Sequence, residues 1–192
     1  MTRLLSAALT SGLLAFIPSA ATAADASVIG DWLVKDGYAN IRIDNCGGKM
    51  WGIVVWEKAP GLDTENPDPA KRTRPTLGMP VLMGLSPAKE PGKWSGEIYN
   101  SNNGKMYSAS ISLADENTLD LEGCLVWPLC QTQKWTRVKA LPPNAAPLPP
   151  LPAAPKQAPP VKKGAAVPPP SEVCMRVAAE TPPAAGAGPA KK

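Results

Sequence analysis

The sequence contains no histidine in its 192 residues. This absence excludes Ser-His-Asp and Cys-His catalysis, histidine-ligated metals and a histidine pH switch. A Cys-x-x-Cys pair is also missing, which disfavours structural zinc, and we expect neither a metal nor another cofactor. The single phenylalanine, Phe16, lies near the N-terminus. Tryptophan must therefore supply most of the bulky core in the rest of the chain.

A strong charge of one sign is lacking as well. The chain has 20 basic and 16 acidic residues, which gives a formal net charge of +4. The bases do not cluster with aromatic residues in the central part of the chain, so we expect no nucleic-acid partner. After the N-terminus, no apolar run is long enough to span a bilayer.

The N-terminal residues have the pattern of an export signal. Arg3 supplies a positive start, and residues 4–17 form an apolar run too short for a stable membrane anchor. Ala21-Thr22-Ala23 matches a cleavage site. We therefore predict a signal peptide over residues 1–23, a periplasmic or secreted location, and no transmembrane anchor after processing.

Export would permit disulfides among Cys46, Cys124, Cys130 and Cys174. Cys124 and Cys130 flank a short turn that contains proline, so we predict a bridge between them. In the chain-entropy model, closing so short a loop stabilises by about 2 kcal/mol. Cys46 and Cys174 are left to pair with each other, to stay reduced, or to link two chains.

The composition changes after about residue 139. More than half of the 24 prolines lie between Pro142 and Pro189, mixed with alanine and lysine. Such a segment buries too little apolar surface to offset the entropy of ordering, so we predict a disordered tail over residues 140–192. The tail is either a solvated spacer or, through its lysines, a contact to cell-envelope polymer. Within it, residues 171–179 could form a helical turn.

Residues 24–139 have the pattern of one all-β domain. Short segments of alternating apolar and polar residues are separated by turn signals about every ten residues. About eight such strands predict an antiparallel barrel or sandwich. The expected strands are residues 29–34, 40–46, 50–57, 81–85, 93–100, 106–113, 118–123 and 131–138.

Two residues favour a barrel over a sandwich. Trp32 lies in the first expected strand, two residues after Gly30, and Arg137 lies in the last. The first and last strands of an up-and-down barrel are neighbours, so the guanidinium can stack on the indole and close one end. Such a contact is worth roughly 1 kcal/mol. At these positions the chain resembles the lipocalins, which have Gly-x-Trp in their first strand and an arginine near the end of the barrel domain.

A longer pattern covers the whole domain. It comprises Asn66-Pro67-Asp68, Arg72-x-Arg74-Pro75, Gly78, Trp94-x-Gly96-x-Ile98-Tyr99, Gly104-x-x-Tyr107, Gly123-Cys124 and Trp135-Thr136-Arg137. With these motifs the chain resembles the DUF2147 family over roughly residues 29–138. The resemblance implies an exported bacterial protein with a lipocalin-like barrel, and it supplies neither a substrate nor catalytic residues. The family often carries a second cysteine in the strand after the Gly-Gly turn, where this chain has Met50-Trp51-Gly52.

Residues 63–78 form a connection too rich in proline and charge to be a strand or a helix. In a structural interpretation, Arg72 and Arg74 bind Asp63 or Asp68 and fix the loop. In a second interpretation, one arginine binds a ligand carboxylate or phosphate at the barrel mouth. A third is calcium binding, although the spacing matches no standard loop. The calcium ligands would be Asp63, Glu65, Asn66 and Asp68.

The interior of an eight-stranded barrel is either filled or holds one small ligand. Glycines and Ala109 at inward positions favour some free space. We predict a ligand site lined by Trp56, Trp94 and Tyr107, with Arg72 or Arg74 at the mouth. The residues expected to face inward are Trp32, Val34, Ile41, Ile43, Met50, Gly52, Val54, Trp56, Trp94, Gly96, Ile98, Tyr107, Ala109, Ile111, Leu119 and Leu121.

These features predict a non-catalytic binding protein for a small apolar or amphipathic ligand. Enzyme activity is not expected, because the acid pairs Asp115-Glu116 and Asp120/Glu122 lie in a turn or on an outward face without a nucleophile. The alternative is an envelope adaptor with a solid barrel. In that case the tail or a barrel face would bind cell-wall polymer or a protein partner.

Overall fold

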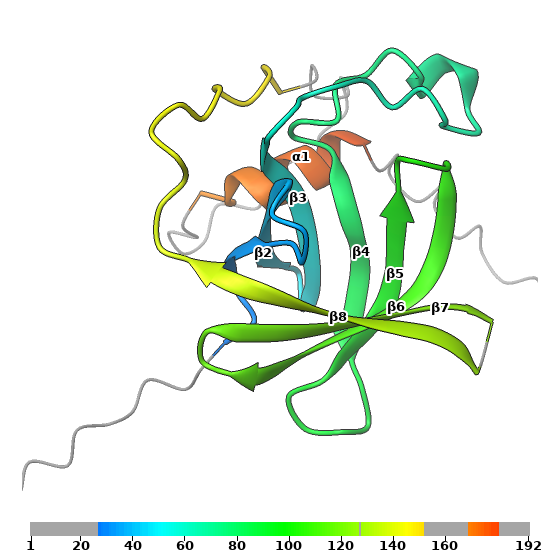
Figure 1. Cartoon of the computed structure of the whole chain (residues 1–192), viewed down its shortest axis with the longest axis vertical. Helices are drawn as coiled ribbons and strands as arrows, with labels where there is room; N and C mark the ends of the chain where they lie inside the picture. Colours follow the sequence, from blue (N-terminus) through cyan, green and yellow to red (C-terminus); the bar gives the residue numbers. More distant parts are fainter. Residues whose placement is uncertain (1–26, 127, 152–168, 181–192) are drawn as a thin grey trace, which may run out of the picture.

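Eight antiparallel strands close into a barrel in the computed structural model, which describes residues 27–126, 128–151 and 169–180. Each strand pairs with the next in sequence, and β8 pairs with β1 (Figure 1). The predicted eight-stranded, lipocalin-like architecture is confirmed. The strands are β1 (Gly30–Leu33), β2 (Ala39–Cys46), β3 (Lys49–Glu57), β4 (Pro80–Pro87), β5 (Trp94–Asn100), β6 (Lys105–Asp115), β7 (Thr118–Val126) and β8 (Leu129–Val138).

One continuous apolar cluster fills much of the barrel interior. Its members alternate with outward-facing residues along the strands, as the pleat of a strand requires. Trp32 and Ile43 are buried on the first two strands, and Ile111 and Leu119 are buried on β6 and β7. The alternation in the sequence therefore identifies the interior face of these strands.

Trp32 and Arg137 close one end of the barrel. They are paired between β1 and β8, and the guanidinium carbon lies 4.1 Å from the indole centroid. Arg137 also donates hydrogen bonds to three backbone carbonyls, those of Ser27 (2.6 Å), Ile29 (3.0 Å) and Glu116 (2.6 Å). The last strand thus fixes both the first strand and the β6–β7 turn.

Gly30 makes room for this guanidinium. A Cβ at Gly30 would lie 2.7 Å from Arg137 Nη1, and the residue has a φ of +135°. Only glycine adopts such a conformation without strain. The Gly-x-Trp motif and the late arginine therefore form a single structural unit.

The helix α1 (Glu172–Glu180) packs on the outside of the barrel, behind β3 in Figure 1. Its Val173 and Val177 contact Ile53 and Val55, two outward side chains of β3. The interior side chains of β3 are apolar as well, so this strand is buried on both faces. That arrangement explains why its sequence is almost entirely apolar.

A disulfide between Cys46 and Cys174 ties α1 to the end of β2, across 128 residues of sequence. The prediction of a disordered tail is therefore wrong for the helical segment, residues 172–180. The valines and the disulfide hold it where the surrounding Pro/Ala composition could not. The rest of the predicted tail is described only at residues 140–151 and 169–171, and there Leu148 packs against the core cluster. Residues 152–168 and 181–192, like the predicted signal peptide, lie outside the described residues.

The β3–β4 connection lies at the end of the barrel opposite the closed one. It contains the short 3₁₀ helix η1 (Pro69–Lys71) and an isolated β-bridge between Leu62 and Pro75, neither of which was predicted. The loop packs tightly on the β5–β6 turn, where a Cβ at Gly104 would collide with the carbonyl of Glu65. Among the described residues, no helix has the length and apolarity needed to cross a membrane.

Candidate ligand-binding site

A pocket of about 540 Å³ opens at the end of the barrel where the β1–β2, β5–β6 and β7–β8 connections meet. This volume falls within the roughly 300–1,000 Å³ typical of small-molecule sites. Several wall residues are solvent-exposed, so the pocket is open to water. Its lining residues are Val34, Tyr38, Ile98, Asn100, Tyr107, Leu121, Gly123, Leu125, Leu129, Cys130, Gln131, Gln133 and Trp135.

The wall formed by β8 changes in chemistry with depth. Four successive inward positions run from the hairpin tip to the interior: Leu129, Gln131, Gln133 and Trp135. Leu129 is 65% exposed, whereas Trp135 is 3% exposed. The pocket therefore has an apolar rim, a polar middle and an apolar floor along this strand.

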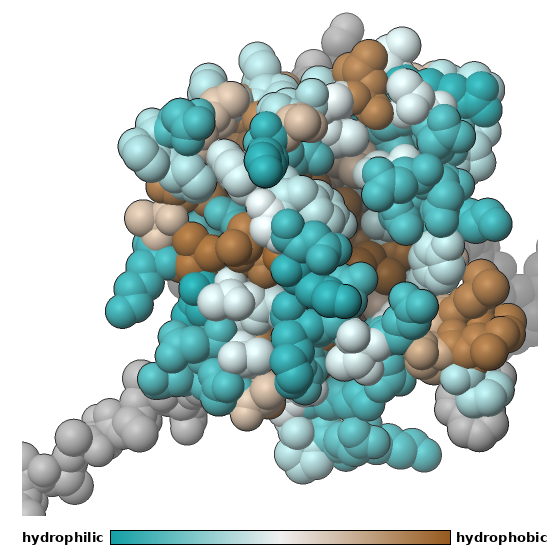
Figure 2. All heavy atoms as spheres, in the orientation of Figure 1, coloured by the Kyte–Doolittle hydropathy of each residue, from teal (hydrophilic) through white to brown (hydrophobic). Residues whose placement is uncertain are grey.

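The neighbouring strand β7 likewise has an apolar residue at the floor of the pocket and another at its rim. Leu121 at the floor is 4% exposed, Gly123 lies in the middle, and Leu125 at the rim is 62% exposed. Gly123 pairs with Gln131, and Leu121 pairs with Gln133. Figure 2 shows apolar side chains, coloured brown, gathered at the tip of the β7–β8 hairpin.

Hydrogen bonds orient some of the polar groups in the middle zone. The Trp135 indole donates to Gln133 Oε1 at 3.3 Å, and Asn103 Nδ2 donates to the Tyr107 hydroxyl at 2.8 Å. The amide nitrogen of Gln133 and the hydroxyl proton of Tyr107 then point to other acceptors. The pocket thus offers donors and acceptors without a formal charge.

Tyr38 adds a phenol at the β1–β2 end of the wall. Its partial burial and the nearby negative charges of Asp36 and Glu57 raise the pKa of the hydroxyl above its ordinary value. The group therefore stays protonated at neutral pH and can donate a hydrogen bond. Of the residues that the structure describes, none that lines the pocket is an aspartate, glutamate, lysine or arginine.

A buried polar network fixes the β3–β4 loop beside this pocket. The fully buried Asp63 carboxylate accepts hydrogen bonds from the Tyr99 hydroxyl (2.7 Å), Asn66 Nδ2 (2.6 Å) and Arg74 Nε (2.9 Å). Arg74 also forms an ion pair with Glu180 of α1. Burial, and next the hydrogen bond to Asp63, raise the pKa of Tyr99 to about 12. The network therefore holds a neutral phenol against a carboxylate.

The same contacts support the structural interpretation of the loop. Arg72 Nε donates to the backbone carbonyl of Asn66 at 2.8 Å, and Arg74 is paired with Asp63. In the described part of the chain, neither arginine lines the pocket. The calcium interpretation is disfavoured as well, because a guanidinium occupies the place beside Asp63 that a cation would need.

Of the other side chains predicted to bind ligand, Tyr107 lines the pocket, whereas Trp56 and Trp94 do not lie among its described residues. Trp94 packs against the core cluster, but it begins β5 at the opposite end of the barrel. Trp56 follows a bulge that shifts the β2–β3 register between Asn40 and Ile41. A bulge shifts the alternation of inward and outward side chains by one residue, so the alternation along the rest of β3 does not predict the direction of Trp56.

The alternation of β8 already carried a signal for the two glutamines that were missed. Gln131 and Gln133 share their parity with the buried Trp135, so they face the same side of the strand. Leu125 and Leu129 were missed for another reason. The expected strands stop short of the cysteines, whereas β7 continues to Val126 and β8 begins at Leu129.

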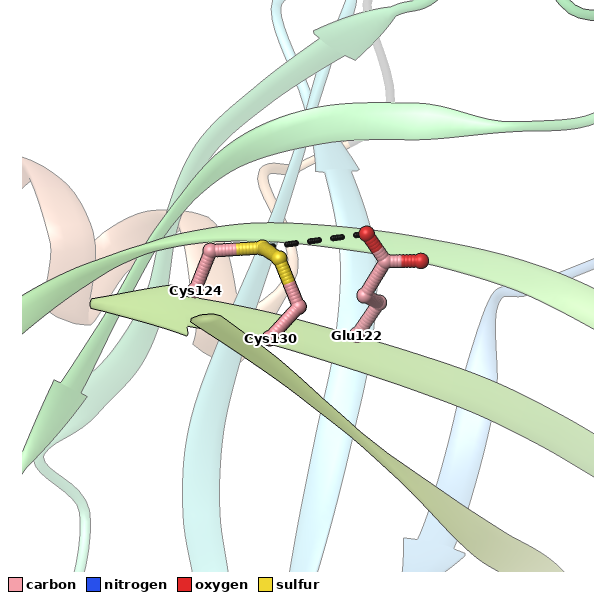
Figure 3. Close-up of side chains that lie close together, drawn as sticks. All are labelled: Glu122, Cys124 and Cys130. Atoms are coloured by element: carbon pink, nitrogen blue, oxygen red, sulfur yellow. Dashed lines mark hydrogen bonds between the residues drawn. A yellow bond between two sulfur atoms is a disulfide. The ribbon is translucent and has the colours of Figure 1, made fainter. Parts of the chain in front are cut away.

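The predicted Cys124–Cys130 disulfide is present and joins directly paired residues of β7 and β8. Glu122 lies beside it, with its Oε1 3.7 Å from Cys124 Sγ (Figure 3). Among the described residues, this trio forms a group whose spacing could suit a metal ion. Both sulfurs are consumed by the bridge, so no thiolate is available to a metal. The disulfide therefore serves to join β7 and β8 at this end of the hairpin.

Comparisons with known proteins agree with the barrel. A family model described as "Uncharacterized protein conserved in bacteria (DUF2147)" matches residues 30–137. A solved structure titled "Protein HP1028 from the human pathogen Helicobacter pylori belongs to the lipocalin family" superposes with a TM-score of 0.54. It shares 19% identity, and the alignment covers 58% of this chain and 83% of that one. The comparison with curated proteins finds no match. At this identity the likeness shows the fold alone.

Proposed function

This chain belongs to the DUF2147 family, and from that premise we propose that it is a non-catalytic protein that binds a small, mostly apolar ligand at the open end of its barrel. The pocket of about 540 Å³, with its floor of Leu121 and Trp135, carries the proposal. An apolar ligand that leaves water for such a floor gains roughly 25 cal/mol for each Å² of apolar surface buried.

Two features support binding without catalysis. The chain has no histidine, and all four cysteines are in disulfides, so neither a Cys–His pair nor a thiolate nucleophile is available. The residues that line the pocket are apolar side chains, amides and phenols.

The two disulfides also support an exported location, because cytoplasmic thiols are kept reduced.

A neutral fluorescent probe, N-phenyl-1-naphthylamine, tests the proposal. The wild-type protein should bind it saturably, with a rise in its fluorescence. The variant Gly123→Phe should abolish this rise, because Gly123 lines the pocket and no described atom lies within 4 Å of a Cβ placed there. The new ring then takes up space in the middle of the pocket without displacing the wall.

Ser108→Phe is the matched control. Ser108 is exposed on the neighbouring strand β6 and lies outside the described pocket wall, so the same ring is added at the surface. This variant should bind the probe as the wild type does. Absence of saturable binding to the wild type, or equal binding to both variants, would contradict a ligand site in this pocket. Circular dichroism would establish that each variant is folded.

The envelope-adaptor function stays a prediction. The part of the tail at residues 172–180, on which that function could draw, is tied to the barrel by the Cys46–Cys174 disulfide. This tether shortens the chain that is free to reach a cell-wall polymer. Deletion of residues 181–192 combined with a cell-wall pull-down would test any contact made by the end of the tail.

A further inference from the structure

We propose that the ligand is an uncharged amphiphile whose hydrogen-bonding group, an ester, amide or hydroxyl, lies in the middle zone of the pocket with apolar parts on either side. This inference rests on the proposed function and specifies its ligand class. It follows from the order of side chains along the wall and from the absence of charged side chains among the described wall residues.

The order of side chains sets the shape of the ligand. Along β8 the inward positions are leucine, glutamine, glutamine and tryptophan, from rim to floor. An apolar chain in contact with Trp135 would place its next group beside Gln133 and Gln131. Beyond them, the exposed Leu125 and Leu129 again offer an apolar surface. A ligand that is polar only at its middle matches all three zones.

The middle zone can both donate and accept hydrogen bonds. Gln131, Gln133 and Asn100 each carry a carbonyl oxygen and an amide nitrogen, and Tyr38 and Tyr107 carry hydroxyls. Amides and phenols can both donate and accept hydrogen bonds. An ester carbonyl, an amide or a hydroxyl of the ligand can therefore form a hydrogen bond there. Burying such a polar group costs free energy unless it is hydrogen-bonded, and the amides and hydroxyls of the middle zone would supply that hydrogen bond.

A charged head group finds no counter-charge in the described pocket wall. Of the two loop arginines, Arg74 is paired with Asp63 and Glu180, and Arg72 donates from Nε to a backbone carbonyl. Neither lies in the described pocket wall. A carboxylate or ammonium placed in the middle zone would lose part of its hydration without gaining an ion pair from the described wall residues, which disfavours its binding relative to a neutral group. The pocket therefore selects for neutral molecules.

Three probes that share a twelve-carbon chain test the selection: N-propyl lauramide, laurate and dodecylammonium. The first is neutral and carries its amide between two apolar parts. Each competes with N-phenyl-1-naphthylamine at pH 7, at concentrations below those at which the probe forms micelles or aggregates. N-propyl lauramide should bind at least 10-fold tighter than either charged probe. Laurate or dodecylammonium binding equally or more tightly would overturn the inference while leaving the binding function intact. Displacement by none of the three, with no saturable binding of the reporter itself, would instead contradict the proposed function.

A charge added to the middle zone should reverse the selection. In Gln131→Lys, the new ammonium supplies the missing counter-charge, and laurate should bind at least 10-fold tighter than it binds the wild type. Gln131 is solvent-exposed, so the substitution is compatible with the fold. Thr132→Lys is the control, since the exposed Thr132 lies outside the described pocket wall and carries the same added charge on the outer face. Equal gains in both variants would overturn the inference.

Discussion

The guanidinium of Arg137 lies over the indole of Trp32, 4.1 Å from the ring centroid, across the seam where β8 meets β1. Trp32 is fully buried, and its Nε1 donates to the carbonyl of Val28 at 2.9 Å. The first and last strands are therefore joined by stacking and hydrogen bonds as well as by the sheet ladder. This junction closes one end of the barrel and leaves the opposite end to carry the pocket.

Arg137→Ala should destabilise the fold by about 2–3 kcal/mol, since it removes the stacking contact and three hydrogen bonds from a charged donor. Urea unfolding followed by tryptophan fluorescence measures the change. Lys134→Ala provides the control, because Lys134 lies on the same strand as Arg137 and forms a solvent-exposed ion pair with Asp120 of β7. Such pairs contribute about 0–1 kcal/mol. Equal losses in the two variants would contradict the role given to Arg137.

Gly30→Ala should cost about 2–3 kcal/mol, because the residue has a φ of +135° and a methyl group would meet Arg137 Nη1. Part of this cost is the collision with the guanidinium and should vanish in the Arg137→Ala background. A double-mutant cycle from urea unfolding should therefore show coupling between the two sites. Strict additivity would mean that Gly30 is required for its backbone conformation alone.

Much of the barrel could be predicted because its signals are local. A two-residue alternation fixes which side of a strand is buried, and turn residues fix where strands end. The closure by Trp32 and Arg137 followed from topology, since an up-and-down barrel must place its first and last strands together. The Cys124–Cys130 bridge likewise needed only a short hairpin.

Other features depend on contacts that a single strand does not encode. The docking of α1 rests on two valines, on Cys174 and on the ion pair of Glu180 with Arg74, within a stretch whose composition is typical of disorder. The apolar outer face of β3, with Ile53 and Val55, was the available signal that something covers it. Trp56, predicted to bind the ligand, does not lie among the described residues of the pocket wall. Alternation shows neither where a bulge lies nor how deep a residue sits along the barrel axis.

Tyr99 should make the stability of the protein pH-dependent in the alkaline range. Its pKa is raised to about 12 by burial and by the hydrogen bond to Asp63, whereas an unfolded tyrosine titrates near 10. The contribution of this group to stability is therefore complete below about pH 10 and is lost as the pH rises through 12. Urea unfolding between pH 8 and 12 should show this decline.

Tyr99→Phe isolates the contribution of the hydroxyl. At pH 7 the variant should be less stable by about 1–3 kcal/mol, because one oxygen of the buried Asp63 loses its donor. The difference from the wild type should shrink between pH 10 and 12. Tyr107→Phe serves as the control, since its hydroxyl contacts the exposed Asn103. A constant difference across the whole range would contradict the assignment to Tyr99.

The Cys46–Cys174 disulfide should contribute more to stability than the Cys124–Cys130 disulfide. The first closes 128 residues of chain and the second closes 6, so the chain-entropy model gives about 5 and about 2 kcal/mol. Replacing both cysteines of one bridge by serine, and then both of the other, tests this order by urea unfolding. Loss of the long bridge should also release α1 and increase hydrogen exchange in residues 172–180, whereas loss of the short one should leave that helix protected. Protection of α1 in both variants would mean that Val173 and Val177 hold the helix without the covalent tether.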